Sequence, residues 1–524
     1  MGSEAMPGTR EFAAEGASLQ SHATTRVAWR ISLPLVMGVL AYIYLLLEPQ
    51  SVLLDGDTYW HIGAGRWILE HLAIPTQDMF SHTVRGSAWT AHEWLAEVIL
   101  AATHQWGGWV AVVSLTALAY AATMALLTRA LLKWLEPIYA VLFVALAASM
   151  TLSHALARPH MLAMPLLMVW AIGLVRASDE RRSPTYWLLP VMVVWANLHG
   201  GFTLGIALTA AFAAEAVWMA WQEDRDPVGM AKRWALFFLL ALGAGMLTPH
   251  GPQGFWFTWE VLTQLSFSLE YIGEWRSPNF HVFQPIELWL LGGLALVLHQ
   301  GLKLPPFRLI ILVGLLHLAL KHARYIELLG LLAPLVVAAP FAQQWRERQQ
   351  AKAQLETLDR FLLKLTQPAS HWAILAAFGL VVATSAWIAR VRPLELPVSA
   401  VPDAAVKAIV RAGVPGNGLN SYEWGGYLIF SGIPVFIDGR ADLYGDAFVK
   451  RYMEGLQLAK PRSLDQMLAK HDIGWTLLPP GSPAVSLLDR MPAWRRLYED
   501  KTAVVHVRRL NAATPATEPG PGKP

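Results

Sequence analysis

The chain has 524 residues, of which 55% are hydrophobic and only 15% are charged, and it carries 24 tryptophans. A composition this apolar is typical of a polytopic membrane protein and argues against a soluble one. The net charge of +3 is too small to indicate a nucleic-acid partner. Because the chain has no cysteine, disulfides, thiolate chemistry and cysteine-ligated metals are excluded.

Apolar stretches of bilayer-spanning length, about 17–25 residues, recur from residue 31 to residue 390. Residues 1–30 before them are polar, lack a cleavable signal peptide and are expected to be a disordered cytoplasmic N-terminus. The segment 94–106 is apolar but too short to cross, and we expect it to lie along the membrane surface. About eleven transmembrane helices are predicted, at 31–47, 109–131, 137–155, 159–175, 185–198, 200–221, 233–248, 286–302, 306–320, 323–343 and 372–390.

The distribution of positive charge predicts the orientation of these spans, because Lys and Arg collect in cytoplasmic loops. With the N-terminus inside, eighteen Lys and Arg fall in cytoplasmic segments. The outer segments before residue 390 hold six, namely Arg66, Arg85, Arg158, Arg276, Lys321 and Arg324. This bias places the first loop and the C-terminal region outside the cytoplasm.

The first outer loop, residues 49–108, is dense in side chains that carry chemistry. Asp55 and Asp57 precede a predicted helix (59–72), and His61 lies one turn after Asp57. These three could hold a divalent metal ion of unspecified identity, or an aspartate could orient a hydroxyl. An aspartate at this position could equally cap the helix. His92 and Glu93 lie directly before the surface segment.

Other polar groups of the membrane part also fall on the outer side, and one converging site is the simplest explanation. Arg158 could bind a phosphate through its donor fork, or it could reach lipid headgroups. His199 could be a satisfied buried histidine, and Glu274 a surface ion-pair partner or a sugar contact. The candidate substrate-binding residues are His61, His92, Arg158, His160, His199, His250, Lys321, Arg324 and Tyr325.

Residues 391–510 are predicted to form a small α/β domain outside the membrane, because short apolar runs alternate there with helical patterns. Within FIDGRADLY (436–444), Asp438, Arg440 and Asp442 follow an apolar run that we expect to be a strand. We interpret them as a charged junction held by its own pairing. The tail 511–524 is expected to be disordered. No nucleotide-binding motif appears, so no nucleotide cofactor is expected.

The triplet of Asp55, Gly56 and Asp57 resembles the acidic motif of integral-membrane glycosyltransferases of the GT-C fold. Bacterial members include enzymes like the protein mannosyltransferases and aminoarabinose transferases. The resemblance extends over about residues 30–340 and includes a short helix, turns at 73–75 and 86–89, and the surface helix. Many members carry Pro–Pro–Leu before that helix, where this chain has His92, Glu93, Trp94 and Leu95.

This resemblance implies a transmembrane GT-C domain at 31–390 and a multi-pass enzyme of the bacterial inner membrane. It would transfer a sugar from a polyprenyl-phosphate carrier to a glycan, lipid or protein acceptor at the outer face. The base of the class corresponds to Asp55, and Asp57 and Glu93 are the other catalytic candidates. Arg and Lys groups, or a metal, would stabilise the released phosphate. The alternatives are a transporter or flippase of a lipid-linked or anionic solute, and a non-catalytic envelope-assembly protein.

Overall fold

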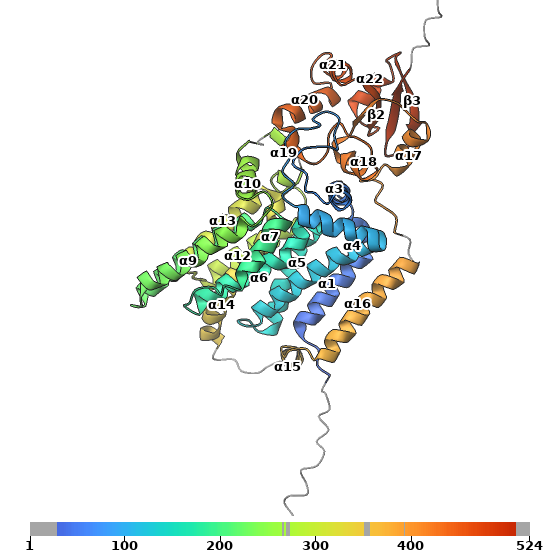
Figure 1. The fold of residues 1–524 in the computed structure, drawn as a ribbon. Helices are drawn as coiled ribbons and strands as arrows, with labels where there is room; N and C mark the ends of the chain where they lie inside the picture. Colours follow the sequence, from blue (N-terminus) through green and yellow to red (C-terminus); the bar gives the residue numbers. More distant parts are fainter. Residues whose placement is uncertain (1–28, 265–266, 269–272, 350–356, 392–393, 510–524) are drawn as a thin grey trace, which may run out of the picture.

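A bundle of long helices and a smaller α/β region at one end of it make up the structure, which is a computed structural model (Figure 1). It describes residues 29–264, 267–268, 273–349, 357–391 and 394–509. The two segments expected to be disordered, 1–30 and 511–524, lie outside this part of the chain except for residues 29 and 30.

Each predicted span coincides with a helix of the bundle. These helices are α1 (Leu33–Leu47), α4 (Trp94–Leu131), α5 (Pro137–Thr151), α6 (Pro159–Asp179), α7 (Leu188–Leu198), α8 (Phe202–Gln222), α9 (Pro227–Gly245), α12 (Pro285–Gln300), α13 (Pro306–Lys321), α14 (Ile326–Gln349) and α16 (His371–Val391). In the described residues, seven helical segments are long and apolar enough to cross a membrane. Helices α1, α7 and α12 are apolar but shorter, and the 16-residue α13 carries Arg308. The number of crossings therefore stays a prediction.

Shorter helices connect the bundle and cover its ends. They are α2 (Pro49–Val52), α3 (Asp57–His71), η1 (Leu152–His154), α10 (Gln253–Gln264), η2 (Gly273–Trp275), η3 (Ala323–Tyr325) and α15 (Thr357–Lys364). Helix α3 is the predicted helix of the first outer loop, and it lies between the bundle and the α/β region (Figure 1).

Helix α4 contains the break that separates the expected surface segment from the expected span. Gly107 and Gly108 have non-helical backbone angles, and Gly108 has φ +61° and ψ −155°. A side chain is strongly disfavoured in that conformation, whereas glycine adopts it readily. The first part of α4 packs closely beneath α3, because a Cβ on Gly65 would lie 2.0 Å from the carbonyl oxygen of Glu97.

The α/β region is built on a four-stranded mixed sheet of order β1-β2-β4-β3. Strand β1 (Asn417–Asn420) runs parallel to β2 (Ile473–Leu478), and β4 (Val504–Arg508) is antiparallel to both β2 and β3 (Trp494–Glu499). The helical elements are α17 (Asp403–Arg411), η4 (Tyr422–Trp424), α18 (Gly425–Phe430), α19 (Ala441–Tyr444), α20 (Asp446–Leu456), α21 (Ser463–Lys470) and α22 (Pro483–Leu488). The predicted fold class, a helical membrane protein with a small α/β region, is confirmed.

One local prediction for this region is wrong. The run before Asp438 is not a strand of the sheet, because its backbone groups pair with the first outer loop. Val435 forms a single parallel bridge with Ser81, and its N–H donates to the carbonyl of Phe80 at 3.0 Å. The segment that was expected to end a strand therefore joins the α/β region to residues 80–83.

Candidate functional site

A cavity of about 890 Å³ lies where the helical bundle, the first outer loop and the α/β region meet. Its size is within the range of ligand-binding pockets in proteins. Ten of the twelve predicted site residues line it, namely Asp55, Asp57, His61, His92, Glu93, Arg158, His160, His199, Arg324 and Tyr325. Segments separated by hundreds of residues are thus brought to one place, as the shared side of the spans predicted.

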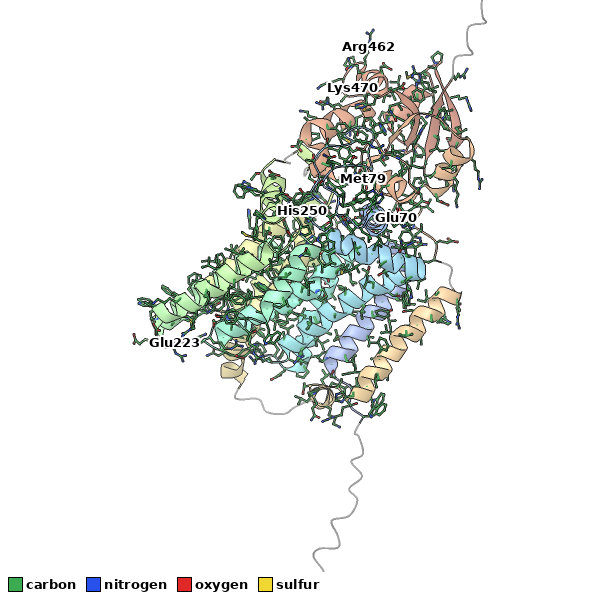
Figure 2. The ribbon with its side chains drawn as sticks, in the orientation of Figure 1. Glu70, Met79, Glu223, His250, Arg462 and Lys470 are labelled. Carbon is green, nitrogen blue, oxygen red and sulfur yellow. The ribbon has the colours of Figure 1, made fainter. Side chains whose placement is uncertain are left out.

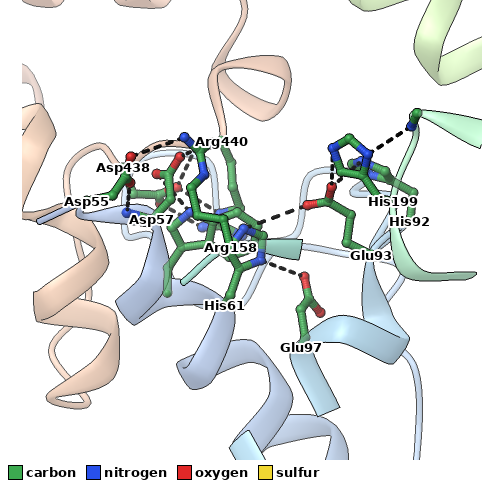
Figure 3. Close-up of polar contacts among 12 residues, drawn as sticks. Asp55, Asp57, His61, His92, Glu93, Glu97, Arg158, His199, Asp438 and Arg440 are labelled. Atoms are coloured by element: carbon green, nitrogen blue, oxygen red, sulfur yellow. Dashed lines mark hydrogen bonds and ion pairs between the residues drawn. The ribbon is translucent and has the colours of Figure 1, made fainter. Parts of the chain in front are cut away.

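Arg158 lies at the centre of the charged part of the cavity (Figure 3). Its Nη1 donates to Asp55 Oδ2 and to Glu274 Oε2, both at 3.1 Å, and its Nη2 lies 2.7 Å from Asp57 Oδ2. Arg324 Nη1 donates to the other oxygen of Glu274 at 3.3 Å. Two guanidiniums and three carboxylates therefore form one network. Glu274 lines the cavity, so the surface ion-pair interpretation of this residue is wrong.

The two aspartates are held differently within this network. Asp55 Oδ1 accepts the N–H of Asp57, the first residue of α3, at 2.7 Å, whereas the N-cap of the helix is Gly56. Asp57 Oδ1 accepts the indole N–H of Trp60 at 3.0 Å. Burial raises the pKa of Asp57 to about 7, with Arg158 opposing the shift and Asp55 and Glu274 adding to it.

Glu274 shows the opposite behaviour, because both guanidiniums face it. Although burial opposes the shift, Arg158 and Arg324 lower the pKa of Glu274 to about 2. Arg324 also lies over the indole of Trp275, with Cζ 4.4 Å from the ring centroid, and Tyr325 packs edge-on against the same ring. The cationic side of the cavity is therefore fixed by η2 and η3 together.

A second cluster surrounds Glu93 (Figure 3). The Nε2 atoms of His61, His92 and His199 lie 3.7, 3.7 and 3.5 Å from its carboxylate oxygens. Burial raises the pKa of Glu93 to about 7, opposed by Arg158 and Arg324. Burial lowers the pKa of all three histidines. At neutral pH this cluster therefore offers neutral hydrogen-bonding groups around a carboxyl that can gain or lose a proton.

The structure does not gather the three residues proposed as metal ligands. Asp55 and Asp57 contact the guanidinium of Arg158, which fills the space between them. His61 faces Glu93 and Glu97 instead, with Nδ1 3.6 Å from Glu97 Oε1. Over the described ranges, no group of three or more His, Asp or Glu side chains is placed to hold a metal ion. The residues present do not fit the expected cation.

Two predicted substrate-binding residues do not line the cavity. His250 lies where the bundle meets the α/β region (Figure 2), and its Nε2 is 3.2 Å from the carbonyl of Ala91. This contact supports the loop before His92. Lys321 is exposed at the end of α13, where its carbonyl accepts the hydroxyl of Ser277. Both residues lie close in sequence to residues that line the cavity, but their side chains point elsewhere. Sequence position alone does not predict that direction.

Several lining residues of the cavity were not among the predicted site residues. Glu97 lies one turn after Glu93, and Glu327 lies one turn after Arg324, with Oε2 3.9 Å from His160 Nε2. Both are acids on otherwise apolar helices, a signal that could have identified them. The α/β region adds Tyr422, Glu423, Gly426, Gly439, Arg440, Ala441 and Asp442 to the lining. The sequence marked Arg440 and Asp442 only as part of a charged junction, and no local pattern marks the others. Only the docking of the two parts brings all of them to the cavity.

Comparisons with known proteins locate this architecture among solved structures. No protein-family model and no curated protein sequence matches the chain. The archaeal oligosaccharyltransferase AglB from Archaeoglobus fulgidus, solved with an inhibitory peptide and a dolichol-phosphate, matches with a TM-score of 0.52 at 9% identity. The match covers 85% of this chain and 69% of that chain. An apo form of an oligosaccharyltransferase from the same organism matches with a TM-score of 0.50 at 9% identity and the same coverage.

A further similar structure is ArnT from Cupriavidus metallidurans bound to undecaprenyl phosphate, with a TM-score of 0.48 at 14% identity. That match covers 91% of this chain and 99% of the other. The oligosaccharyltransferase matches establish the fold: this chain has the GT-C fold of membrane glycosyltransferases, as the resemblance of the first outer loop implied.

Proposed function

We propose that this protein transfers a sugar from a polyprenyl-phosphate carrier to an acceptor hydroxyl at the outer face of the membrane. The observation that carries the proposal is one cavity lined by Arg158, Arg324 and Asp57, in which Arg158 contacts Asp57, a carboxyl with a raised pKa. A phosphate needs the cations, and the acceptor needs the base. The presence of a dolichol-phosphate in the AglB structure supports the choice of carrier.

The walls of the cavity suit the two ends of such a donor. The side formed by α6, α8 and α13 is apolar, with Met164, Leu167, Leu204 and Leu318. The isoprenoid part of the donor would contact this side, because apolar surface removed from water favours binding. The headgroup would lie between Arg158, Arg324 and the outer loop, where the polar groups gather.

In the proposed reaction the acceptor oxygen forms a bond to the anomeric carbon as the bond from that carbon to the phosphate oxygen breaks. Asp57 takes the proton of the acceptor hydroxyl, since a base with a pKa near the working pH is the most effective. We choose Asp57 over the Asp55 of our sequence-based prediction because burial raises the pKa of Asp57 to about 7. The oxygens of both aspartates have partners, since Asp55 binds the N–H of Asp57 and Arg158, and Asp57 binds Trp60 and Arg158.

The other groups have supporting roles in this proposal. The released polyprenyl phosphate carries the electron pair of the broken bond, and the guanidiniums of Arg158 and Arg324 stabilise its charge. Glu93 and the neutral histidines His61, His92 and His199 would hydrogen-bond sugar hydroxyls. The acceptor would be a glycan, a lipid or a protein.

The test is release of polyprenyl phosphate by the purified full-length protein in lipid nanodiscs. Polyprenyl-phosphate sugars would be supplied with membrane extract as the source of acceptor. We expect wild-type protein to release the lipid phosphate in step with sugar transfer, and Arg324→Gln to bind the donor at least about tenfold more weakly, a loss of about 1.4 kcal/mol. The matched control is Arg411→Gln, since Arg411 is exposed on α17.

Two results would contradict the proposal. Donor that binds but is never turned over, with any extract, would favour a binding or assembly protein. Donor that crosses the membrane intact would favour the flippase alternative. The lipid-linked intermediates that accumulate in cells without the protein would identify the sugar.

A further inference from the structure

Three glycines bring the α/β region into backbone contact with the Asp55–Asp57 turn. A Cβ on Gly56 would lie 2.3 Å from the carbonyl oxygen of Glu423, and a Cβ on Gly426 would lie 2.0 Å from the carbonyl oxygen of Gly56. A Cβ on Gly439 would lie 1.8 Å from Asp57 Oδ1. A side chain at position 56 or 426 would collide with backbone, and one at position 439 would displace the Asp57 carboxylate. The two segments therefore touch closely at all three positions.

Buried polar contacts of residues near Gly439 hold the α/β region against the first outer loop. Arg440, next to Gly439, is 2% exposed and pairs with Asp438 at 2.7 Å in its own segment and with Asp78 at 2.9 Å in the first outer loop. His82 donates its N–H to the carbonyl of Val435 at 3.0 Å. Gly439 therefore cannot easily move away from Asp57, because Val435 before it and Arg440 after it both contact the first outer loop.

The carboxylate of Asp57 is consequently enclosed by three groups. The indole N–H of Trp60 holds Oδ1 from α3, and the Arg158 guanidinium holds Oδ2 from the start of α6. Gly439 of the α/β region closes the remaining side of Oδ1. A methyl group at position 439 would have to push Oδ1 away, which would break the bond from Trp60 and disturb the pair with Arg158.

We propose that Gly439 is a positioning residue for the transfer reaction: the α/β region acts through it to hold the Asp57 carboxylate in its reactive orientation. This inference rests on the proposed function, in which Asp57 takes the acceptor proton. It makes the α/β region a part of the catalytic centre, because the orientation of a group on the first outer loop depends on a residue about 380 positions later in the chain. Without docking of that region the cavity also lacks its outer wall.

The first test is Gly439→Ala in the full-length protein. A displacement of a catalytic group by about 1 Å can cost about 10²-fold in rate, so we expect kcat to fall about 10²-fold while KM for the donor changes little. Gly481→Ala is the matched control, because a Cβ there meets nothing within 4 Å. If Gly439 acts through Asp57, then adding Gly439→Ala to Asp57→Asn should lower kcat no further. A full additional loss in the double variant would overturn the inference.

A second readout does not depend on turnover. Infrared spectra recorded against pH, with the Asp57→Asn spectrum subtracted, isolate the protonation of the Asp57 carboxyl. We expect a midpoint near 7 in the wild type and a shift of that midpoint in Gly439→Ala, since the contacts of both carboxylate oxygens change. An unchanged midpoint would overturn the inference. A shifted midpoint in a protein that transfers no sugar would uphold the contact and defeat only the proposed function.

Docking itself can be measured because the chain has no cysteine. Ser81→Cys with Val435→Cys places two thiols at bridge partners, and oxidation should link them quantitatively, as detected by mass spectrometry of the joined peptides. The link should form equally well with Gly439→Ala present, and turnover of the linked protein should match that of its reduced form. Loss of the link in Gly439→Ala, or loss of turnover on linking, would overturn the positioning role.

Discussion

At the residue scale, the cavity holds more negative than positive charge around its centre. Asp55, Asp57 and Glu274 face the guanidiniums of Arg158 and Arg324. Burial is the main cause that raises the pKa of Asp57 to about 7, and the negative charges of Asp55 and Glu274 add to the shift while Arg158 opposes it. Glu274, between both guanidiniums, stays ionised.

Replacing Asp57 by Asn should lower turnover about 10²–10⁴-fold, because general-base catalysis contributes about that factor. Asp55→Ala should cost less in turnover and about 0.5–1.5 kcal/mol in stability, since it removes the acceptor of the Asp57 N–H. Sugar transfer per folded molecule measures the first effect, and thermal unfolding measures the second. Asp465→Asn on exposed α21 is the control. If Asp57→Asn turned over at nearly the wild-type rate, Asp57 would not be the general base.

The raised pKa values also predict the pH dependence of turnover. A carboxyl whose pKa is raised to about 7 holds its proton below that pH, so the basic form of Asp57 is lost as the pH falls through 7. At saturating donor, kcat should therefore drop about tenfold per unit below pH 7 and level off above it. Glu93 titrates in the same window, so Glu93→Gln separates the two contributions. If kcat instead fell only as the pH dropped through about 4, a carboxylate with an ordinary pKa would be the base.

Chelation tests the place of Arg158 between the two aspartates. The Arg158 guanidinium contacts both carboxylates, where a metal ion would otherwise bind. An arginine stays charged and is not removed by a chelator, so we expect turnover with EDTA to stay within about twofold of turnover without it. Activity lost to EDTA and restored by Mn²⁺ or Mg²⁺ would show that a cation displaces Arg158 from Asp55 and Asp57.

At the element scale, the first outer loop is held from both sides. Its helix α3 packs on α4 through Gly65 and on α18 through Gly63, where a Cβ would lie 2.8 Å from a methyl of Ile429. Arg440 of the α/β region enters the loop between Asp78 and the ring of Trp89, whose centroid is 4.7 Å from Cζ. The loop is therefore an ordered layer of the protein, and its shape depends on both neighbours.

Removing Arg440 should loosen this layer. In Arg440→Leu, the buried carboxylates of Asp438 and Asp78 lose their cation, and breaking a buried pair in this way costs about 3–5 kcal/mol. A lower unfolding temperature and faster proteolysis of the α/β region should follow, with the exposed Arg411→Leu as control. Unchanged stability would mean that Arg440 contributes little to docking.

At the scale of the whole molecule, polar groups gather at both ends of the bundle. At the end away from the α/β region, where Glu223 lies (Figure 2), Arg308 of α13 contacts Asp179 of α6 and Glu215 of α8 at 2.8 Å. This buried cluster ties three helices together. The cavity lies at the opposite end, so the bundle separates this ion cluster from the one around Arg158.

The proposed orientation can be measured with single cysteines, because the chain has none. Gly481→Cys in the α/β region and Gln222→Cys at the end of α8 are both exposed positions. A membrane-impermeant maleimide added to intact cells should label the first and spare the second, since the Lys and Arg bias puts the α/β region outside. Labelling of Gln222→Cys alone would reverse the orientation, and with it the face at which transfer is proposed.

The helices and the fold class could be predicted from the sequence. Hydropathy is a local property, so the apolar runs mark α1, α4–α9, α12–α14 and α16 without knowledge of their neighbours. Likewise Gly107 and Gly108 mark the end of the short segment before the longer apolar run of α4. The acids and histidines of the first outer loop also stood out locally, since such groups are rare beside membrane spans.

Which of these groups meet could not be predicted, because it depends on the three-dimensional packing of the helices and the α/β region. That Arg158 contacts both aspartates, and that Lys321 lies outside the cavity, depends on where separate helices end in space. The role of Gly439 beside Asp57 has no local signal at all. Charges and close contacts act over a few ångströms in space, whatever the separation along the chain. The packing of the α/β region on the first outer loop therefore determines which groups come into contact.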